Sequence, residues 1–194
     1  ILKSDALIYS FGSNGITSFE QAINKISHSD NIFIFDPTLT PAKRAAVKEV
    51  KFPLIEIGLV GKTNQNEFDG KVSKLYPTRT LPDHMRHLGH ANKKINVLKV
   101  DIEGSEYSAF SDIVIGECAT ADILVDQLLI EVHGVDRNLV ISLMKMLHKC
   151  NMRLFSKERN GWGCHGWYCL EYSFVSPSFA FEVFQSTHPS CLAK

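Results

Sequence analysis

The sequence predicts an α/β fold in which a mainly parallel, doubly wound sheet of seven strands carries helices on both faces. Two observations support this prediction. Short apolar runs alternate with amphipathic stretches along most of the chain, which is typical of strand–helix–strand units with right-handed crossovers. The last two strand-like runs have no helix between them, which predicts an antiparallel strand at one edge. No internal repeat, low-complexity segment or linker divides residues 1–194, so we expect a single domain.

The seven expected strands are the short runs rich in β-branched and aromatic residues. Most of them end at glycine, at Asp-Pro or at acidic residues, which stop a strand. In chain order these runs are residues 6–10, 31–35, 54–57, 97–100, 127–132, 152–155 and 168–175.

The expected helices combine apolar spacing of three and four residues with recognisable ends. The first has Phe19, Ala22, Ile23 and Ile26 on one face, and Thr17 or Ser18 can cap it. Proline opens the second, and glycine ends the third. Residues 61–80 are polar and rich in turns, so we expect a long loop with a short strand near 71–75. The helices are residues 18–26, 41–50, 81–89, 106–116 and 137–149.

Composition excludes some classes of protein. The formal net charge of the 194 residues is zero, so a basic surface for a phosphate backbone is not expected and a nucleic-acid partner is disfavoured. No apolar run approaches the roughly 20 residues of a membrane span. Because the chain opens directly into a strand-like run, an anchor or targeting segment upstream is compatible with it. Cytoplasmic and secretory locations are therefore both open, as is the oligomeric state.

The chain contains five cysteines, Cys118, Cys150, Cys164, Cys169 and Cys191, and their spacing matches no zinc-binding pattern. We expect structural thiols. The alternative is a disulfide among the last four in a secreted protein, although no Asn-x-Ser/Thr glycosylation site is present.

A glycine-containing loop follows the first strand. Gly12 and Gly15 precede the first helix. Glycine lets the backbone approach a ligand closely, and the N-terminus of the helix that follows presents N–H groups to an anion. The Gly-x-Gly-x-x-Gly dinucleotide fingerprint is absent, which disfavours a nicotinamide dehydrogenase. An ordinary tight turn is the alternative.

Asp36 ends the second strand, 24 residues after Gly12. An acid at about this distance from a glycine loop accepts hydrogen bonds from ribose hydroxyls in nucleoside-binding α/β folds. The alternative is an aspartate that starts a turn before Pro37.

Acidic residues and a histidine follow two neighbouring strands. Asp101 and Glu103 come after the fourth strand, and Glu131 and His133 end the fifth. Spacing of two residues places each pair on one side of its strand, so we expect all four to converge where α/β folds bind ligands. His133 is the first candidate for a base that takes a proton from a substrate hydroxyl, and Glu103 the second. Alternatively, the four residues bind a divalent metal such as Mg²⁺ or Mn²⁺.

Three further histidines, His84, His87 and His90, are spaced three residues apart. A metal-binding trio is conceivable, but a solvated helix face is favoured.

These motifs together resemble the FkbM-type S-adenosylmethionine-dependent methyltransferases, especially their eukaryotic methyltransferase-like branch. The resemblance rests on the Lys-x-Asp-x-Glu-Gly-x-Glu string and on several shorter segments, and it covers nearly the whole chain. These segments are IYSFGSNG at 8–15, FDP at 35–37, VLKVDIEGSE at 97–106, LIEVH at 129–133, LFSKERN at 154–160 and EYSF at 171–174.

The resemblance implies a Rossmann-like, seven-stranded methyltransferase sheet that binds S-adenosylmethionine. Gly12, Ser13 and Asn14 would line its methionine part, Asp36 its ribose, and Gly58 and Leu59 its adenine, while Asp101 would border both the methionine end and the substrate. Other expected cofactor contacts are Ser10, Phe11 and Pro37, and the catalytic set would be Asp101, Glu103, Glu131 and His133.

The implied activity is methylation of a hydroxyl oxygen on a small-molecule or glycan-like acceptor. A catalytically inactive methyltransferase-fold module that only binds is the alternative.

Overall fold

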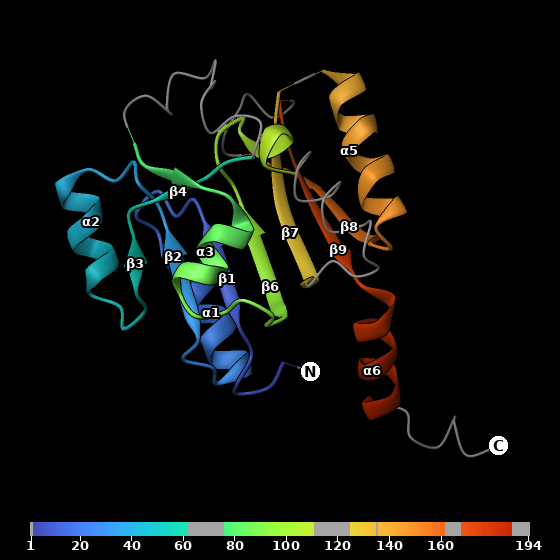
Figure 1. Cartoon of the computed structure of the whole chain (residues 1–194), viewed down its shortest axis with the longest axis horizontal. Coiled ribbons are helices and arrows are strands. Elements are labelled where there is room, and N and C mark those ends of the chain that lie inside the picture. The colour runs from blue at the N-terminus through green and yellow to red at the C-terminus, as the bar shows by residue number, and fades with distance from the viewer. Residues whose placement is uncertain (1, 62–75, 111–124, 135, 162–167, 188–194) are drawn as a thin grey trace.

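The computed structural model describes residues 2–61, 76–110, 125–134, 136–161 and 168–187. Seven strands form one sheet in the order β3-β2-β1-β6-β7-β9-β8, which crosses the molecule in Figure 1. The strands are β1 Ile8–Phe11, β2 Ile32–Phe35, β3 Leu54–Ile55, β6 Ile95–Val100, β7 Val125–His133, β8 Arg153–Arg159 and β9 Cys169–Val175.

The sheet is parallel from β3 to β7, and β9 runs antiparallel to both β7 and β8. The predicted architecture is therefore confirmed, including the antiparallel pair at one edge. The chain crosses from β1 to β2 and β3 on one side, and it then returns to place β6 on the other side of β1. β1 and β6 consequently lie at the centre, where the direction of winding reverses and ligands bind in such sheets.

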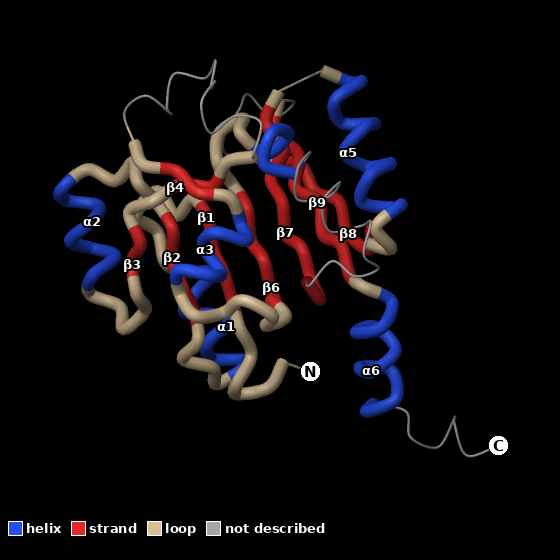
Figure 2. Tube along the Cα trace, viewed as in Figure 1, coloured by secondary structure: helices blue, strands red, loops and turns tan. Residues whose placement is uncertain are grey.

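Helices cover both faces of the sheet, as expected (Figure 2). α1 and α2 contribute Ile23 and Val47 to one apolar core, and α3 and α5 contribute residues such as Met85 and Leu143 to the other. The helices are α1 Ser18–Ser27, α2 Pro41–Lys48, α3 Leu81–His87, α5 Arg137–Lys149 and α6 Pro177–Thr187, and residues 106–110 are also helical.

α1 differs from its predicted orientation. Ile26 is 71% exposed, and the buried residues are Glu20, Ile23 and Ser27. The helix is turned in this way because Glu20 Oε1 accepts a hydrogen bond of 2.5 Å from Ser10 Oγ on β1. The side of α1 that faces the sheet therefore carries a carboxylate. Thr17 is the N-cap residue, but its side chain makes no capping hydrogen bond.

Three elements, β4, β5 and α6, were not predicted from the sequence. Gly58–Leu59 (β4) pairs in parallel with Thr78–Arg79 (β5). β4 directly follows the expected strand 54–57, and β5 lies within the loop expected over residues 61–80. α6 follows the last strand and buries none of its side chains. The expected strand near 71–75 and the end of the expected helix 106–116 lie outside the described residues.

The cysteines require a correction. Cys150, at the end of α5, and Cys169, at the start of β9, are both buried and disulfide-bonded. The expectation of thiols is therefore wrong for these two residues, and the disulfide alternative holds for them. The other three cysteines lie outside the described residues.

Gly12 allows the end of β1 to approach the end of β6. Its φ is +78°, and a Cβ at this position would lie 1.6 Å from the carbonyl oxygen of Asp101. Its amide donates to Phe35 O on β2 at 2.9 Å. Only glycine fits this arrangement, because any side chain would push apart the two central strand ends.

Replacement of Gly12 by alanine should therefore destabilise the fold far more than the same change at Gly89. Gly89 has a similar φ of +70°, but in the described part of the chain no atom lies within 4 Å of the position that a Cβ would take there. Gly89→Ala should cost about 1 kcal/mol from backbone strain alone, and Gly12→Ala about 3 kcal/mol or more because of the clash. Chemical denaturation measures both free energies of unfolding. Equal losses would show that the approach to Asp101 is not a constraint.

Candidate functional site

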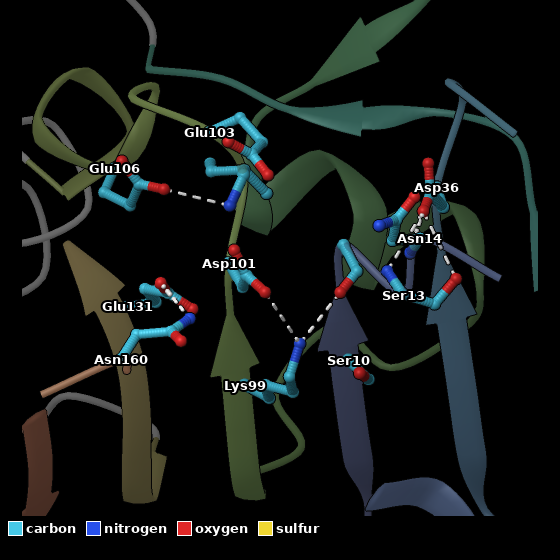
Figure 3. A network of polar contacts seen from close by, with 12 residues as sticks. Ser10, Ser13, Asn14, Asp36, Lys99, Asp101, Glu103, Glu106, Glu131 and Asn160 are labelled. Atoms are coloured by element: carbon cyan, nitrogen blue, oxygen red, sulfur yellow. Dashed lines mark hydrogen bonds and ion pairs between the residues drawn. The ribbon is translucent and has the colours of Figure 1, made fainter. Parts of the chain in front are cut away.

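The candidate site lies at the carboxyl ends of β1, β2, β6 and β7, where the polar residues of Figure 3 gather. Asp36 fixes the glycine loop there. Its Oδ2 accepts hydrogen bonds from the backbone N–H of Ser13 at 3.0 Å and of Asn14 at 2.9 Å, and also from Ser13 Oγ. Its Oδ1 accepts from the amide and the hydroxyl of Thr38. The turn that was the alternative interpretation of Asp36 is thus present, whereas its contact with a ribose stays a prediction.

Lys99 links the glycine loop to the acidic cluster, which consists of Asp101, Glu103 and Glu131 around His133. Its Nζ donates to Gly12 O at 2.8 Å and lies 3.7 Å from Asp101 Oδ2 (Figure 3). The side chain comes from β6, beside Ser10 in the register with β1. A single cation therefore holds the loop and the first acid of the cluster together.

A cavity of about 320 Å³ opens between the glycine loop, the end of β2 and the segment after β6. This volume lies in the usual range for small-molecule sites. Eight of the ten expected cofactor residues line it: Phe11, Gly12, Asn14, Asp36, Pro37, Gly58, Leu59 and Asp101. Ser10 and Ser13 do not, because Ser10 bonds to Glu20 and Ser13 to Asp36. The lining also includes Phe35, Thr38, Val60, Thr78, Ile102, Glu103 and Ser105.

His84 supports the wall of this cavity from behind. The residue is 1% exposed, and its Nε2 lies 3.0 Å from Gly58 O, which it bonds as a donor. Its ring contacts those of Phe11 and Phe35 edge-on. Burial lowers the pKa of His84 to about 4, so the ring is neutral at pH 7.

The three spaced histidines form neither a metal trio nor a solvated face. His84 and His90 are both buried, and His90 Nδ1 lies 2.7 Å from Tyr9 OH. Only His87 matches the favoured expectation of an exposed side chain. His84 on α3 packs against Phe11 of β1, and His90, which follows the helix, bonds to Tyr9 of the same strand. These contacts explain why α3 has a polar ring on its inner side.

The four residues expected to converge do so around His133. Its Nε2 lies 3.5 Å from Glu103 Oε2, and 3.8 Å from both Asp101 Oδ1 and Glu131 Oε1. Glu131 Oε1 also accepts a hydrogen bond of 2.8 Å from Asn160 Nδ2 (Figure 3). Burial raises the pKa of Glu131, and the charge of Asp101 adds to this while the bond from Asn160 opposes it.

Glu106 organises this cluster, a role that was not predicted from the sequence. The side chain is fully buried. Its Oε1 accepts from the amide of Ile102 and lies 2.9 Å from His133 Nδ1, and its Oε2 accepts from the amide of Gly104. Sequence position suggested only a favourable acid in the first turn of a helix. Glu106 contacts His133, which lies 27 residues later in the chain, only because the pairing of β6 with β7 brings the two residues together.

The acidic neighbours of His133 favour its protonated form. Burial alone would lower its pKa, but the hydrogen bond and charge of Glu106, together with the charges of Glu103 and Glu131, raise the pKa of His133 to about 9. A ring with this pKa carries a proton at pH 7 and cannot accept another. The role of His133 as the first candidate base stays a prediction, and it requires a form of the site in which one ring nitrogen carries no proton.

A second cavity, of about 240 Å³, lies against β6, β7 and β9. Asp101 lines both cavities, and Glu131, Lys99 and Tyr172 line the second. The acidic cluster thus stands at the junction of the two cavities.

Comparisons with known proteins identify the family of the chain. Residues 1–176 match the profile of a family described as a methyltransferase domain, and the chain belongs to this family. No curated protein matches the chain. Within the described residues, no helix combines the length and apolar character that crossing a membrane requires.

Solved structures show the same fold at low sequence identity. A methyltransferase FkbM from Methylobacillus flagellatus is 13% identical with a TM-score of 0.53, over 89% of this chain and 44% of that one. The fibrillarin of Aeropyrum pernix, solved with natively bound S-adenosyl-L-methionine, is 12% identical with a TM-score of 0.50, over 90% and 67%. TrmK of M. capricolum, solved with S-adenosyl-homocysteine, is 8% identical with a TM-score of 0.47, over 91% and 65%. The chain thus spans 65% of TrmK and under half of FkbM.

Buried His84 should make the fold sensitive to acid. Its pKa is about 4 in the folded chain and near 6.5 when unfolded, so the unfolded state binds more protons between these values. Stability should fall as the pH drops from about 6.5 towards 4. His84→Gln keeps a donor for Gly58 O but has no group that titrates in this range. Over the same pH interval, the free energy of unfolding of this variant should therefore fall by up to about 3 kcal/mol less than that of wild type. Urea denaturation at several pH values measures the effect, and His87→Gln, at an exposed position, is the control. Parallel pH profiles for wild type and His84→Gln would contradict the assignment.

Proposed function

We propose that this chain is an S-adenosylmethionine-dependent methyltransferase that holds the cofactor in the 320 Å³ cavity. The observation that carries the proposal is the coincidence of this cavity with the glycine loop and Asp101 in a chain of the methyltransferase-domain family. The fibrillarin of Aeropyrum pernix, which has a similar fold, was solved with natively bound S-adenosyl-L-methionine. The absence of a dinucleotide fingerprint disfavours a nicotinamide cofactor.

The cofactor would lie along the cavity from Asp101 to Leu59. Its methionine part would contact Gly12 and Asn14, and its adenine part Gly58 and Leu59, all of which line the cavity. Asp36 would contribute mainly by fixing the loop, because five donors already engage its carboxylate. A ribose hydroxyl would have to donate to a carboxylate oxygen of Asp36 that already accepts hydrogen bonds from the protein.

The acceptor would be a hydroxyl on a small-molecule or glycan-like substrate, bound in the second cavity. This cavity shares Asp101 with the cofactor cavity, and Glu131, Lys99 and Ser173 offer polar contacts there. The zero net charge of the chain favours such an acceptor over a nucleic acid. Solved structures that are 12% and 13% identical to this chain share only its fold, so they do not separate these acceptors.

Methyl transfer requires that the acceptor oxygen lie in line with the methyl carbon and the sulfur, and that one group accept the hydroxyl proton. The acceptor oxygen forms a bond to the methyl carbon as the sulfur–carbon bond breaks, and its electron pair stays on sulfur to give neutral S-adenosylhomocysteine. The hydroxyl proton passes to a carboxylate of the cluster, and Glu131 is the one that lines the second cavity without lining the first. Holding both reactants in line supplies most of the acceleration.

A valine at position 58 should block the cofactor. A Cβ on Gly58 would lie 3.3 Å from Pro37 Cγ and 3.4 Å from Thr78 Cγ2, so the branched side chain narrows the cavity between two of its walls. Calorimetric titration with S-adenosylhomocysteine should show micromolar binding to wild type and at least about tenfold weaker binding to Gly58→Val.

The matched control is Gly161→Val, because no atom of the described residues lies within 4 Å of a Cβ at that position. It should bind S-adenosylhomocysteine as wild type does, and NAD should bind none of the three proteins. Absence of S-adenosylhomocysteine and S-adenosylmethionine binding to wild type would overturn the proposed function.

A further inference from the structure

We propose that Asp101, Glu103 and His133 form a binding site for one divalent cation of the Mn²⁺ type. The described residues bring one ligand atom from each of these side chains within 4.8 Å of the others. The role given to the cation below rests on the methyl-transfer function proposed above, whereas the site itself does not.

The imidazole geometry carries the proposal. Glu106 holds Nδ1 of His133 at 2.9 Å, so Nε2 is the nitrogen that faces Asp101 Oδ1 at 3.8 Å and Glu103 Oε2 at 3.5 Å. Around a cation with bonds of about 2.1 Å, two ligand atoms lie about 3.0 Å apart when adjacent and about 4.2 Å apart when opposite. Both separations from Nε2 lie between these limits, and the ligand atoms of Asp101 and Glu103 lie within 4.8 Å of each other. A cation in the centre would take the place of the proton on Nε2.

Glu106 fixes the second ligand as well as the first. It accepts from the amides of Ile102 and Gly104, which flank Glu103, and Glu103 has a φ of +57°. One fully buried carboxylate thus holds the loop of one ligand and the ring of another. A carboxylate that orients a histidine towards a metal is a recurrent arrangement in metal sites.

The remaining groups limit the ligand set to three. Asp101 directs Oδ2 to Lys99 and leaves Oδ1 facing His133. Glu131 already accepts from Asn160 through the oxygen nearer to His133. Cys169, which lies close to Glu131 and His133, is disulfide-bonded and offers no thiolate. Two carboxylates, one imidazole and no thiolate suit Mn²⁺, and three ligands leave positions for other oxygens.

The position of the site indicates the class of acceptor. Asp101 and Glu103 line the cofactor cavity, and Asp101 also lines the second cavity, so the cation would stand where the acceptor oxygen meets the methyl group. Open coordination positions favour acceptors with two neighbouring oxygens, such as a vicinal diol or a hydroxy acid. A hydroxyl bound to a cation loses its proton more readily, and Glu131 would receive that proton.

Manganese binding tests the site without cofactor or acceptor. Electron paramagnetic resonance of free Mn²⁺ should show one bound ion for each wild-type chain. Glu103→Gln and His133→Gln should each weaken binding by about tenfold or more. The side chain of Glu103 is 78% exposed, so this variant is expected to fold normally. The control Glu182→Gln changes an exposed acid on α6 and should bind as wild type does.

S-adenosylhomocysteine binding, measured on the same samples, separates the two proposals. Wild type that binds S-adenosylhomocysteine but no Mn²⁺ overturns the cation site and leaves the methyltransferase function standing. Mn²⁺ binding that is equal in all variants also overturns the site, because the ion then lies elsewhere. Mn²⁺ binding that is lost in both site variants supports the site, even where S-adenosylhomocysteine fails to bind and the proposed function falls.

Discussion

The arrangement of the candidate site depends on the buried carboxylate of Glu106. Removing a carboxylate from water is costly unless hydrogen bonds replace its hydration. Glu106 gains two backbone N–H donors from the segment after β6, and it also meets the imidazole of His133 at the end of β7. These contacts join two neighbouring strand ends that no backbone ladder connects at this point. This connection fixes the loop that carries Glu103 and the ring of His133, while Lys99 and Asn160 hold Asp101 and Glu131.

A second constraint sets the distance between the cofactor cavity and the cluster. β1 and β6 end so close together that the Cα of Gly12 meets the carbonyl of Asp101, and Lys99 bridges the same two residues. The glycine loop and the acids therefore belong to one rigid unit rather than to two independent loops. Preorganisation of this kind matters for methyl transfer, because small errors in alignment reduce the rate severely.

The sequence contains enough local information for the sheet but not for all of the site. The alternation of strands and helices, and the convergence of Asp101, Glu103, Glu131 and His133, follow from periodicity and are confirmed by the structure. The contact of Glu106 with His133 depends on the register of β6 and β7, which no local pattern contains. His84 and His90 were misjudged for the same reason, because burial of a polar ring depends on which residues of another element provide its partners.

The insertion of β9 between β7 and β8 has a consequence for folding. β7 is an interior strand, yet one of its two neighbours is the last strand of the sheet to be synthesised. Until residues 169–175 leave the ribosome, one edge of the nine-residue strand β7 has no partner in the nascent chain. Such an edge can pair with the wrong strand. Completion of the sheet must await a contact between distant parts of the chain, which slows folding. In the finished sheet β8 occupies the exposed edge instead, and its charged residues Arg153, Lys157 and Arg159 protect that edge against pairing with other chains.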